Sequence, residues 1–277
     1  MPDKTSKRRL LAPANRSLLL ELAQDNTLFA FDFDGTLAPI VGDPQKAFLP
    51  HPTWHALSAL SRMAKVAVIS GRSQTDLQRR LPVEVAYVIG NHGNEGFPVE
   101  DRASRIEQEH CCSVWLRQLL AQNIASHDWH HVVGATIEDK GRTLCMHYRH
   151  CANHEQAHAV LSQFATNLIP PAQVVEGLAT INLLPLRARN KGDAMRSLMT
   201  HSGCARALFI GDDMTDELAF AVAPSGWITA KVGRADQSLA RFRLNNTREV
   251  RTLLELLVWY RQSIRPQATL CTGESTV

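Results

Sequence analysis

The chain has 277 residues, of which 44% are hydrophobic and 21% are charged. This balance is too apolar for a disordered chain and too evenly mixed for a membrane protein. Thirty lysines and arginines oppose 27 acidic residues, giving a formal charge of +3. So small and scattered an excess argues against nucleic acid as a partner. The six cysteines lack paired metal-ligand spacing and are too few for a disulfide scaffold, which favours a reducing compartment.

The N-terminal segment carries Arg8 and Arg9 and is briefly similar to a twin-arginine export signal. Pro13, Asn15 and Glu21 interrupt the apolar stretch that such a signal requires. No stretch approaches the roughly 18 apolar residues of a membrane span. We therefore expect a cytoplasmic protein that makes no contact with a membrane.

Four short apolar runs end in Gly or in polar residues that can take part in chemistry; they cover residues 28–31, 66–69, 85–89 and 207–210. Continuous apolar runs of this kind are typical of buried parallel strands. Helical patterns alternate with them, which predicts a Rossmann-like parallel α/β sheet with helices on both faces. In such sheets ligands bind beyond the carboxyl ends of the strands, where the polar residues fall.

The spacing breaks between the Gly-rich turn at 90–96 and Lys191, where the connection is longer than one helical crossover needs. This segment predicts helices near 104–126 and 153–168 and strands near 131–137, 143–149 and 178–184. We expect an inserted α+β cap domain. The predicted organisation is a discontinuous core of residues 25–103 and 186–262, a cap of residues 104–185, an N-terminal extension of residues 1–24 and a flexible tail of residues 263–277.

The first strand ends in two aspartates, Asp32 and Asp34, followed by Gly35. Two carboxylates two residues apart crowd negative charge at a sheet edge, which raises one pKa unless a cation or amides neutralise it. An Asp-Gly turn after a strand explains the same tripeptide equally well.

A second strand ends in Asp212 and Asp213, with Asp216 three residues further on. One of these aspartates could cap a helix near 214–222. Capping does not explain why two strands deliver paired carboxylates to one edge. Hard oxygen ligands at an open edge suit Mg²⁺, which takes a few carboxylates and a phosphate. We therefore favour a magnesium site.

Lys191 and Ser70 complete a set of groups suited to phosphoryl transfer. An ammonium offsets charge on the nucleophile and the phosphoryl oxygens, and a hydroxyl holds those oxygens. Taken singly, these are an ordinary surface lysine and an ordinary loop serine. The chain has no GxxxxGK[ST] loop, so P-loop nucleotide chemistry has no support.

The ordered motifs resemble those of haloacid dehalogenase-like phosphatases and, more narrowly, of the trehalose-6-phosphate phosphatase family. The matching segments are 31–37, 70–72, 190–192 and 211–217, with further matches at 38–40, 90–95, 138–140 and 147–149. The resemblance extends roughly from residue 28 to residue 260.

The resemblance implies hydrolysis of trehalose 6-phosphate through an aspartyl-phosphate. Asp32 would attack phosphorus, and Asp34 would protonate the leaving sugar oxygen and later take a proton from water. Ser70 and Lys191 would complete the catalytic set. The Mg²⁺ ligands would be the Asp32 carboxylate, the Asp34 backbone carbonyl and Asp212, with Asp213 bound directly or through water.

The resemblance also implies a sugar site beneath the cap, formed by Gly71, Arg72, His92, Glu138, Lys140, Arg149 and Asn182. Without the resemblance, the simpler interpretation of Glu138 and Lys140 is a solvated ion pair on a strand. Asn182 departs from the family, since many members carry a glutamate there. A neutral amide binds a hydroxyl more weakly than a carboxylate does, so weaker trehalose 6-phosphate binding or another phosphorylated disaccharide both fit.

Other functions stay open at this point. The alternatives are a phosphatase for a related sugar phosphate, a receiver-type signalling module and a catalytically inactive sugar-phosphate sensor. The Asp-x-Asp spacing and the cap-sized insert argue against the receiver module, and the complete set of Asp32, Asp34, Lys191 and Asp212 argues against the sensor. We expect a monomer whose partner is a small-molecule sugar phosphate. The spacing of His154 and His158 is one that zinc sites use, but without a third ligand a solvated helix face is favoured.

Overall fold

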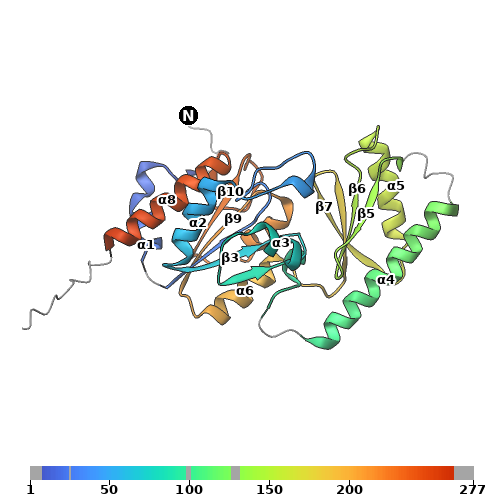
Figure 1. Cartoon of the computed structure of the whole chain (residues 1–277), viewed down its shortest axis with the longest axis horizontal. Helices are drawn as coiled ribbons and strands as arrows, with labels where there is room; N and C mark the ends of the chain where they lie inside the picture. The colour runs from blue at the N-terminus through green and yellow to red at the C-terminus, as the bar shows by residue number, and fades with distance from the viewer. Residues whose placement is uncertain (1–7, 25, 98–100, 126–131, 265–277) are drawn as a thin grey trace, which may run out of the picture.

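The computed structural model describes residues 8–24, 26–97, 101–125 and 132–264 (Figure 1). Most of the predicted C-terminal tail, residues 265–277, lies outside them. Two sheets organise the chain: a parallel sheet at one end of the molecule and an antiparallel sheet at the other. Within the described residues, no helix has both the length and the apolar composition needed to cross a membrane.

The larger sheet confirms the predicted parallel α/β fold, because all of its strand pairs are parallel. Its strands lie in the order β1 (Arg8–Arg9), β11 (Phe242–Leu244), β10 (Trp227–Val232), β9 (Arg206–Gly211), β2 (Thr27–Phe31), β3 (Lys65–Ile69) and β4 (Tyr87–Ile89). The central position of β2 between β9 and β3 follows from its wholly buried sequence, which packs on both faces.

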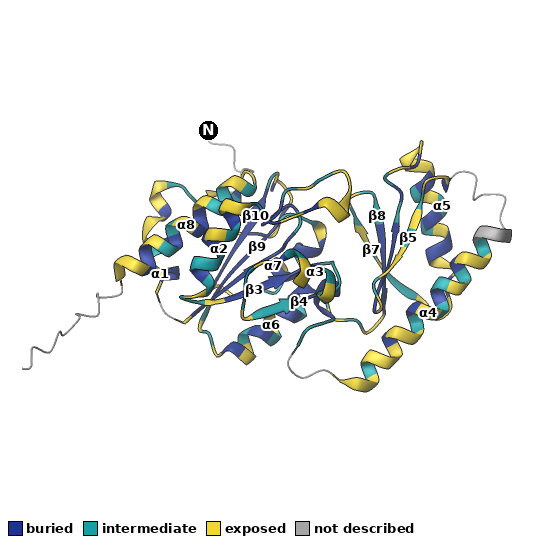
Figure 2. Ribbon diagram, in the orientation of Figure 1, coloured by how far each residue is buried: buried dark blue, intermediate teal, exposed yellow. Residues whose placement is uncertain are grey.

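Helices cover both faces of this sheet, as a buried parallel sheet requires. One hydrophobic cluster contains residues of α1 (Arg16–Leu22), α2 (His51–Ser61), α3 (Gln74–Arg80) and α8 (Thr247–Ile264). A second contains residues of α6 (Lys191–Ser202) and α7 (Glu217–Ala221). Figure 2 shows the buried residues concentrated on strands such as β9 and β10 and on the helix faces that pack against them.

The smaller sheet belongs to the inserted α+β region. Its order is β5 (Thr136–Asp139), β6 (Leu144–His147), β8 (Thr180–Pro185) and β7 (Ala172–Gly177), with every neighbouring pair antiparallel. Helices α4 (Arg102–Ala125) and α5 (His154–Thr166) pack on the face turned away from the larger sheet (Figure 1). The opposite face, which these helices leave free, is turned toward the larger sheet.

Several elements differ from the sequence-based prediction. The strand expected at 131–137 begins at Thr136, because residues 132–134 form a turn. The helix expected at 214–222 is a 3-10 turn, Met214–Asp216, followed by the short helix α7. Strand β7 was not predicted, since its sequence has neither a continuous apolar run nor a regular alternation and none of its residues is fully buried. Strand β10 was missed because Lys231 interrupts its apolar run.

The N-terminal segment contributes to the larger domain. Strand β1 pairs with β11 at the sheet edge, and Leu10, Leu19 and Leu22 are buried in the same hydrophobic cluster as the central strands. Residues 8–22, predicted as an extension, thus add a strand and a helix to the layers of this sheet. The residue boundaries of the two domains stay predictions.

We predict that Arg261 is a structural arginine of this domain. The residue is only 3% exposed, and its guanidinium donates hydrogen bonds to the carbonyl oxygens of Ala23 (3.0 Å), Gln24 (2.8 Å) and Met63 (2.7 Å). Arg261→Met keeps the apolar stem but strands these acceptors, which costs about 1–3 kcal/mol of unfolding free energy.

Thermal unfolding should show a Tm lower by about 2–4 °C for each kcal/mol lost. Arg248→Met, an exposed change on the same helix, serves as the matched control. If both variants melt with the wild type, the prediction is wrong.

Candidate active site

Three neighbouring strands end at the same edge of the larger sheet and place the predicted catalytic side chains there. Asp32 follows β2, Ser70 follows β3, and Asp212 follows β9. The backbone N–H of Asp32 donates to the Ile210 carbonyl at 2.9 Å, which continues the pairing of β2 with β9 beyond the regular strand. The sheet register therefore brings together residues far apart in the sequence.

Lys191 joins two of the aspartates at this edge. Its ammonium donates to Asp32 Oδ1 at 2.8 Å and to Asp216 Oδ1 at 2.7 Å, and all three side chains are buried. Lys191 is the first residue of α6, and the side chain of Asn190 caps that helix by accepting from the N–H groups of Gly192 and Asp193. Burial alone would lower the pKa of Lys191, but the charges of Asp216 and Asp32 outweigh it and raise that pKa, so the ammonium stays charged.

Asp216 belongs to the motif at 211–217, but the sequence indicated no separate role for it. The structure places it at the centre of the loop that follows β9. Its Oδ1 accepts from Lys191, while its Oδ2 accepts from the backbone N–H groups of Asp212 and Asp213, each at 2.9 Å. Asp216 therefore fixes the loop that carries the paired aspartates. The signal available in the sequence was the Asp-Asp-x-x-Asp spacing.

Asp32, Asp212 and Asp216 form an acidic cluster able to hold a metal ion, since one oxygen of each lies within 4.8 Å of the others. Burial raises the pKa of Asp32 well above its ordinary value despite the opposing effect of Lys191. Burial and the neighbouring Asp216 raise the pKa of Asp212 to about 7. The single ammonium of Lys191 thus leaves negative charge at this edge uncompensated, and the carboxylate oxygens present suit a hard divalent cation.

Gly35 and Thr36, which follow β2, allow Asp212 to lie close to the end of that strand. Thr36 Oγ1 donates to Asp212 Oδ1 at 3.2 Å. Gly35 has φ +78°, and a Cβ at this position would overlap the Asp212 carboxylate. The glycine of this motif is thus required by a positive φ and by the close approach of a second strand end.

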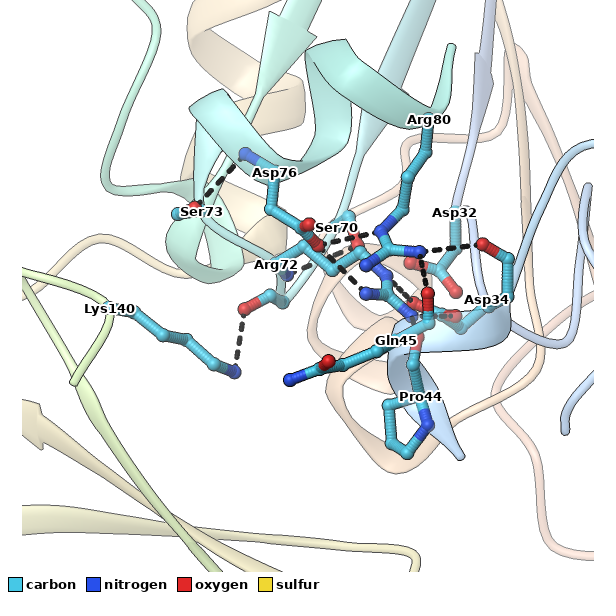
Figure 3. A network of polar contacts seen from close by, with 12 residues as sticks. Asp32, Asp34, Pro44, Gln45, Ser70, Arg72, Ser73, Asp76, Arg80 and Lys140 are labelled. Atoms are coloured by element: carbon cyan, nitrogen blue, oxygen red, sulfur yellow. Dashed lines mark hydrogen bonds and ion pairs between the residues drawn. The ribbon is translucent and has the colours of Figure 1, made fainter. Parts of the chain in front are cut away.

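The side chain of Asp34 points to Arg72 (Figure 3). Arg72 Nε donates to Asp34 Oδ2 at 2.6 Å and Nη2 to Asp34 Oδ1 at 2.7 Å, a bidentate pair. Arg72 also contacts Asp76 Oδ2 at 2.8 Å and the Pro44 carbonyl at 2.8 Å. Arg72, predicted as a substrate contact, is therefore held by groups of the protein itself and orients Asp34.

The carboxylates of Asp213 and Asp34 lie outside the acidic cluster of Asp32, Asp212 and Asp216. Asp213 Oδ1 accepts from the N–H of Met214 at 2.7 Å and caps the following 3-10 turn, while its carbonyl accepts from Lys231 Nζ at 2.9 Å. Asp34, which is predicted to bind the ion through its backbone carbonyl, directs its carboxylate to Arg72. Among these residues, Asp32 and Asp212 share the acidic cluster.

Ser70, Gly71 and His92 lie together beside the acidic cluster. Ser70 Oγ accepts from the Arg72 N–H at 3.2 Å, and the Ser70 carbonyl accepts from the N–H of His92 at 2.9 Å. A Cβ on Gly71 would overlap the His92 ring. His92 has φ +59° and is buried; burial and the charges of Lys140 and Lys191 lower its pKa well below the ordinary value. His92 is therefore a neutral ring packed between core and cap.

Two basic side chains of the cap, Lys140 and Arg149, donate hydrogen bonds to carbonyl groups of the larger domain. Lys140 Nζ donates to the Gly71 carbonyl at 3.0 Å (Figure 3), so Lys140 is not part of a solvated pair. Arg149 Nη1 donates to the carbonyls of Val41 at 2.9 Å and Gly42 at 3.0 Å. Both bases thus hold the cap sheet over the edge that carries Asp32.

The other predicted cap residues lie on the sheet itself. Glu138 Oε2 is 2.9 Å from His147 Nε2 and 3.9 Å from Lys140 Nζ. Hydrogen bonds to Cys145 and Glu138 raise the pKa of His147 to about 9. Asn182 Nδ2 donates to the Val175 carbonyl at 3.2 Å. His154, which is exposed, contacts the Arg149 carbonyl, and the partly exposed His158 contacts Glu176.

The acidic sheet edge beneath an inserted cap defines the class of protein. A nucleophile-bearing strand end, a buried lysine and a loop of paired aspartates in this order are features of haloacid dehalogenase-like phosphatases. Within this class, the chain belongs to the trehalose-phosphatase family, whose model matches residues 30–242.

Relatives of known name agree with this assignment. The chain is 30% identical over 236 residues to trehalose-6-phosphate phosphatase of Escherichia coli (strain K12), covering 82% of this chain and 85% of the relative. It is 27% identical over 254 residues to trehalose-phosphate phosphatase B of Arabidopsis thaliana, covering 84% and 67%. Among solved structures, the C-terminal domain of C. albicans trehalose-6-phosphate phosphatase matches with a TM-score of 0.74 and 25% identity, covering 93% of this chain and 99% of that one.

We predict that His92 makes the fold acid-sensitive. A histidine whose pKa is lowered by folding takes up its proton only in the unfolded chain, so its contribution to stability is present above about pH 6.5 and is lost as pH falls. The free energy of unfolding should therefore fall by up to about 1.4 kcal/mol per pH unit below pH 6.5.

His92→Asn should flatten this slope, since Asn tolerates the positive φ but does not titrate. Urea unfolding between about pH 5 and pH 7.5 measures the difference. The exposed His110→Asn is the matched control and should keep the wild-type slope. Parallel curves for His92→Asn and wild type would contradict the prediction.

Proposed function

We propose that this chain is a Mg²⁺-dependent phosphatase that hydrolyses trehalose 6-phosphate to trehalose and phosphate through an aspartyl-phosphate. The observation that carries this proposal is the buried Asp32, paired with Lys191 and crowded by Asp212. The substrate is proposed from the family and from the polar residues of the cap. The protein would act as a monomer on this small molecule.

The Asp32 carboxylate is the proposed nucleophile. Lys191 holds Oδ1, which orients the carboxylate and favours its ionised form against the effect of burial, and Oδ2 is left to attack phosphorus. The bond between this oxygen and phosphorus forms as the bond from phosphorus to the sugar oxygen breaks. Lys191 and the Ser70 hydroxyl are proposed to hold the phosphoryl oxygens.

The residues proposed to hold Mg²⁺ are Asp32, Asp212 and the backbone carbonyl of Asp34, with Asp213 bound directly or through water. When bound, the ion reduces the repulsion between the anionic nucleophile and the anionic phosphate. The raised pKa values of Asp32 and Asp212 support this assignment, because a cation at this point would relieve the same crowding of charge.

Asp34 is the proposed acid and base. It would give a proton to the leaving sugar oxygen and then take one from the water that hydrolyses the aspartyl-phosphate. Both of its oxygens are engaged by Arg72 in this structure. Proton transfer therefore requires the paired arrangement to open on one oxygen, and Arg72 acts as the residue that positions Asp34.

The proposed sugar site lies between the cap sheet and the edge of the larger sheet. Glu138, Lys140, Arg149 and Asn182 come from the cap, and His92 lies below them. Lys140 and Arg149 already bind core carbonyls, so the sugar would compete with these contacts or insert beside them. Polar groups left unpaired by a wrong substrate cost about 1–3 kcal/mol each, which is the proposed basis of selectivity.

Asp32→Asn should lower turnover by about four orders of magnitude or more, because the amide is not a nucleophile. Phosphate release is measured from trehalose 6-phosphate, sucrose 6-phosphate and glucose 6-phosphate, with Mg²⁺ and with EDTA. The wild type should prefer trehalose 6-phosphate and should stop in EDTA.

The exposed Asp236→Asn is the control and should match the wild type. No turnover by the wild type on any of these compounds would overturn the enzyme proposal. Equal turnover of glucose 6-phosphate and trehalose 6-phosphate would overturn the disaccharide specificity alone.

We predict that Asn182→Glu improves sugar binding, because a charge-assisted hydrogen bond is roughly twice as strong as a neutral one. The expected change is a KM for trehalose 6-phosphate lower by about tenfold with kcat little changed. Asn182→Gln, which adds length without charge, is the matched control. If KM and kcat are unchanged in both variants, this position does not contact the sugar.

A further inference from the structure

The cap sheet carries a cluster of three metal-ligating side chains outside the acidic sheet edge. Glu138 on β5 lies directly opposite Cys145 on β6. His147 lies two residues beyond Cys145 on the same strand, so its side chain is on the same face of the sheet. One donor atom each of Glu138, Cys145 and His147 lies within 4.8 Å of the others, and Glu138 Oε2 is 2.9 Å from His147 Nε2.

The donor set differs in chemistry from the proposed Mg²⁺ site. Thiolate, imidazole and carboxylate together are ligands for Zn²⁺ and similar transition metals, while Mg²⁺ prefers oxygen alone. A tetrahedral zinc site with bonds of about 2.0–2.3 Å holds its donors about 3.3–3.8 Å apart. The donor atoms lie within 4.8 Å of one another, so rotation of the side chains would have to bring the widest pair closer by about 1 Å.

The burial of the three residues gives the cluster a closed side and an open side. Cys145 is 2% exposed, the side chain of His147 is 24% exposed and that of Glu138 is 52% exposed. An ion can therefore approach past Glu138 and reach the sulfur from the open side. Three protein ligands leave the fourth position for water, as in open zinc sites.

The cluster overlaps the proposed sugar site. Asn182 on β8 lies opposite Cys145 in the sheet register, and Lys140 Nζ is 3.9 Å from Glu138. Lys140 Nζ lies closer to the Gly71 carbonyl, at 3.0 Å, than to Glu138, and Glu138 is closer to His147 than to Lys140. A metal on Glu138 would thus occupy a carboxylate that the sugar needs.

We propose that Cys145, His147 and Glu138 form a transition-metal site in the cap, and that Zn²⁺ bound there inhibits the enzyme by withdrawing Glu138 from the sugar. Binding forms bonds from the metal to Cys145 Sγ, the His147 ring nitrogen and a Glu138 oxygen. The thiol proton and the proton on that ring nitrogen are released to solvent. The inhibition rests on the proposed function, while the metal binding does not.

Metal binding is tested by adding Co²⁺ to the full chain, which is first freed of transition metals and then kept in excess Mg²⁺. The wild type should show a thiolate-to-cobalt charge-transfer band in the near ultraviolet. Cys145→Ser should lose this band, and Glu138→Gln should weaken Co²⁺ binding by about tenfold. Cys111→Ser, which alters another cap thiol, and Asp212→Asn, which alters the acidic edge, should both keep it.

A wild type without the band, or a band that survives in Cys145→Ser, would overturn the metal site. Because Glu138 is half exposed, Glu138→Gln is expected to fold even if Cys145→Ser does not. Unchanged Co²⁺ affinity in Glu138→Gln would remove that residue from the site and overturn the proposal. The spectrum does not depend on turnover, so it decides the question even if no phosphate ester is hydrolysed.

The inhibition is tested by titrating Zn²⁺ into the trehalose 6-phosphate assay at saturating Mg²⁺. Zn²⁺ should raise KM with little effect on kcat, and Cys145→Ser should need about tenfold more Zn²⁺ for the same inhibition. Equal inhibition of both proteins would place the effect at the acidic edge and overturn the inhibitory role of the cap site. A wild type that hydrolyses no ester would refute the proposed function instead.

Discussion

The buried ammonium of Lys191 is the interaction on which the rest of the sheet edge depends. Two aspartates from different strand ends, Asp32 and Asp216, are withdrawn from water and share this one cation. A buried charge without a partner is strongly destabilising, so removal of the lysine would leave two buried carboxylates that repel each other. The same contact ties the N-terminus of α6 to β2 and to the loop after β9. The proposed catalytic geometry and the local fold therefore both depend on this side chain.

A second constraint comes from the way the loops around this edge are held. Asp216 uses its remaining oxygen to bind the N–H groups of Asp212 and Asp213, and Arg72 binds both oxygens of Asp34. Asp212 and Asp34, to which a chemical role is proposed, are thus each positioned by a second residue. Such positioning matters because a nucleophile and an acid contribute only when they are aligned with the reacting atoms.

Much of this arrangement could be predicted from the sequence, for a physical reason. Parallel strands must end at one edge, so short apolar runs that lead into Asp32, Ser70 and Asp212 identify the site before its geometry is known. The pairing of side chains could not be predicted in this way, because it depends on rotamers and on contacts between distant segments. Asp216 and the Arg72–Asp34 pair are examples. Strand β10 was not predicted because Lys231 interrupts its apolar pattern. The ammonium of Lys231 binds the Asp213 carbonyl, a contact that the sequence does not show.

The two faces of the cap sheet carry different kinds of side chain: the helix-covered face is apolar, and the face turned toward the candidate active site carries polar and metal-ligating groups. Leu144, Met146 and Ile181 are buried on the helix side, while the alternate positions carry Cys145 and Asn182. Alternation along a strand forces every second residue to the other side. The positions that contribute nothing to the cap core are free to carry polar and metal-ligating groups. Because Cys145 lies opposite both Glu138 and Asn182 in the sheet register, a ligand bound to one of these residues would lie next to the others. Cys145 therefore has the neutral amide of Asn182 on one side and the carboxylate of Glu138 on the other.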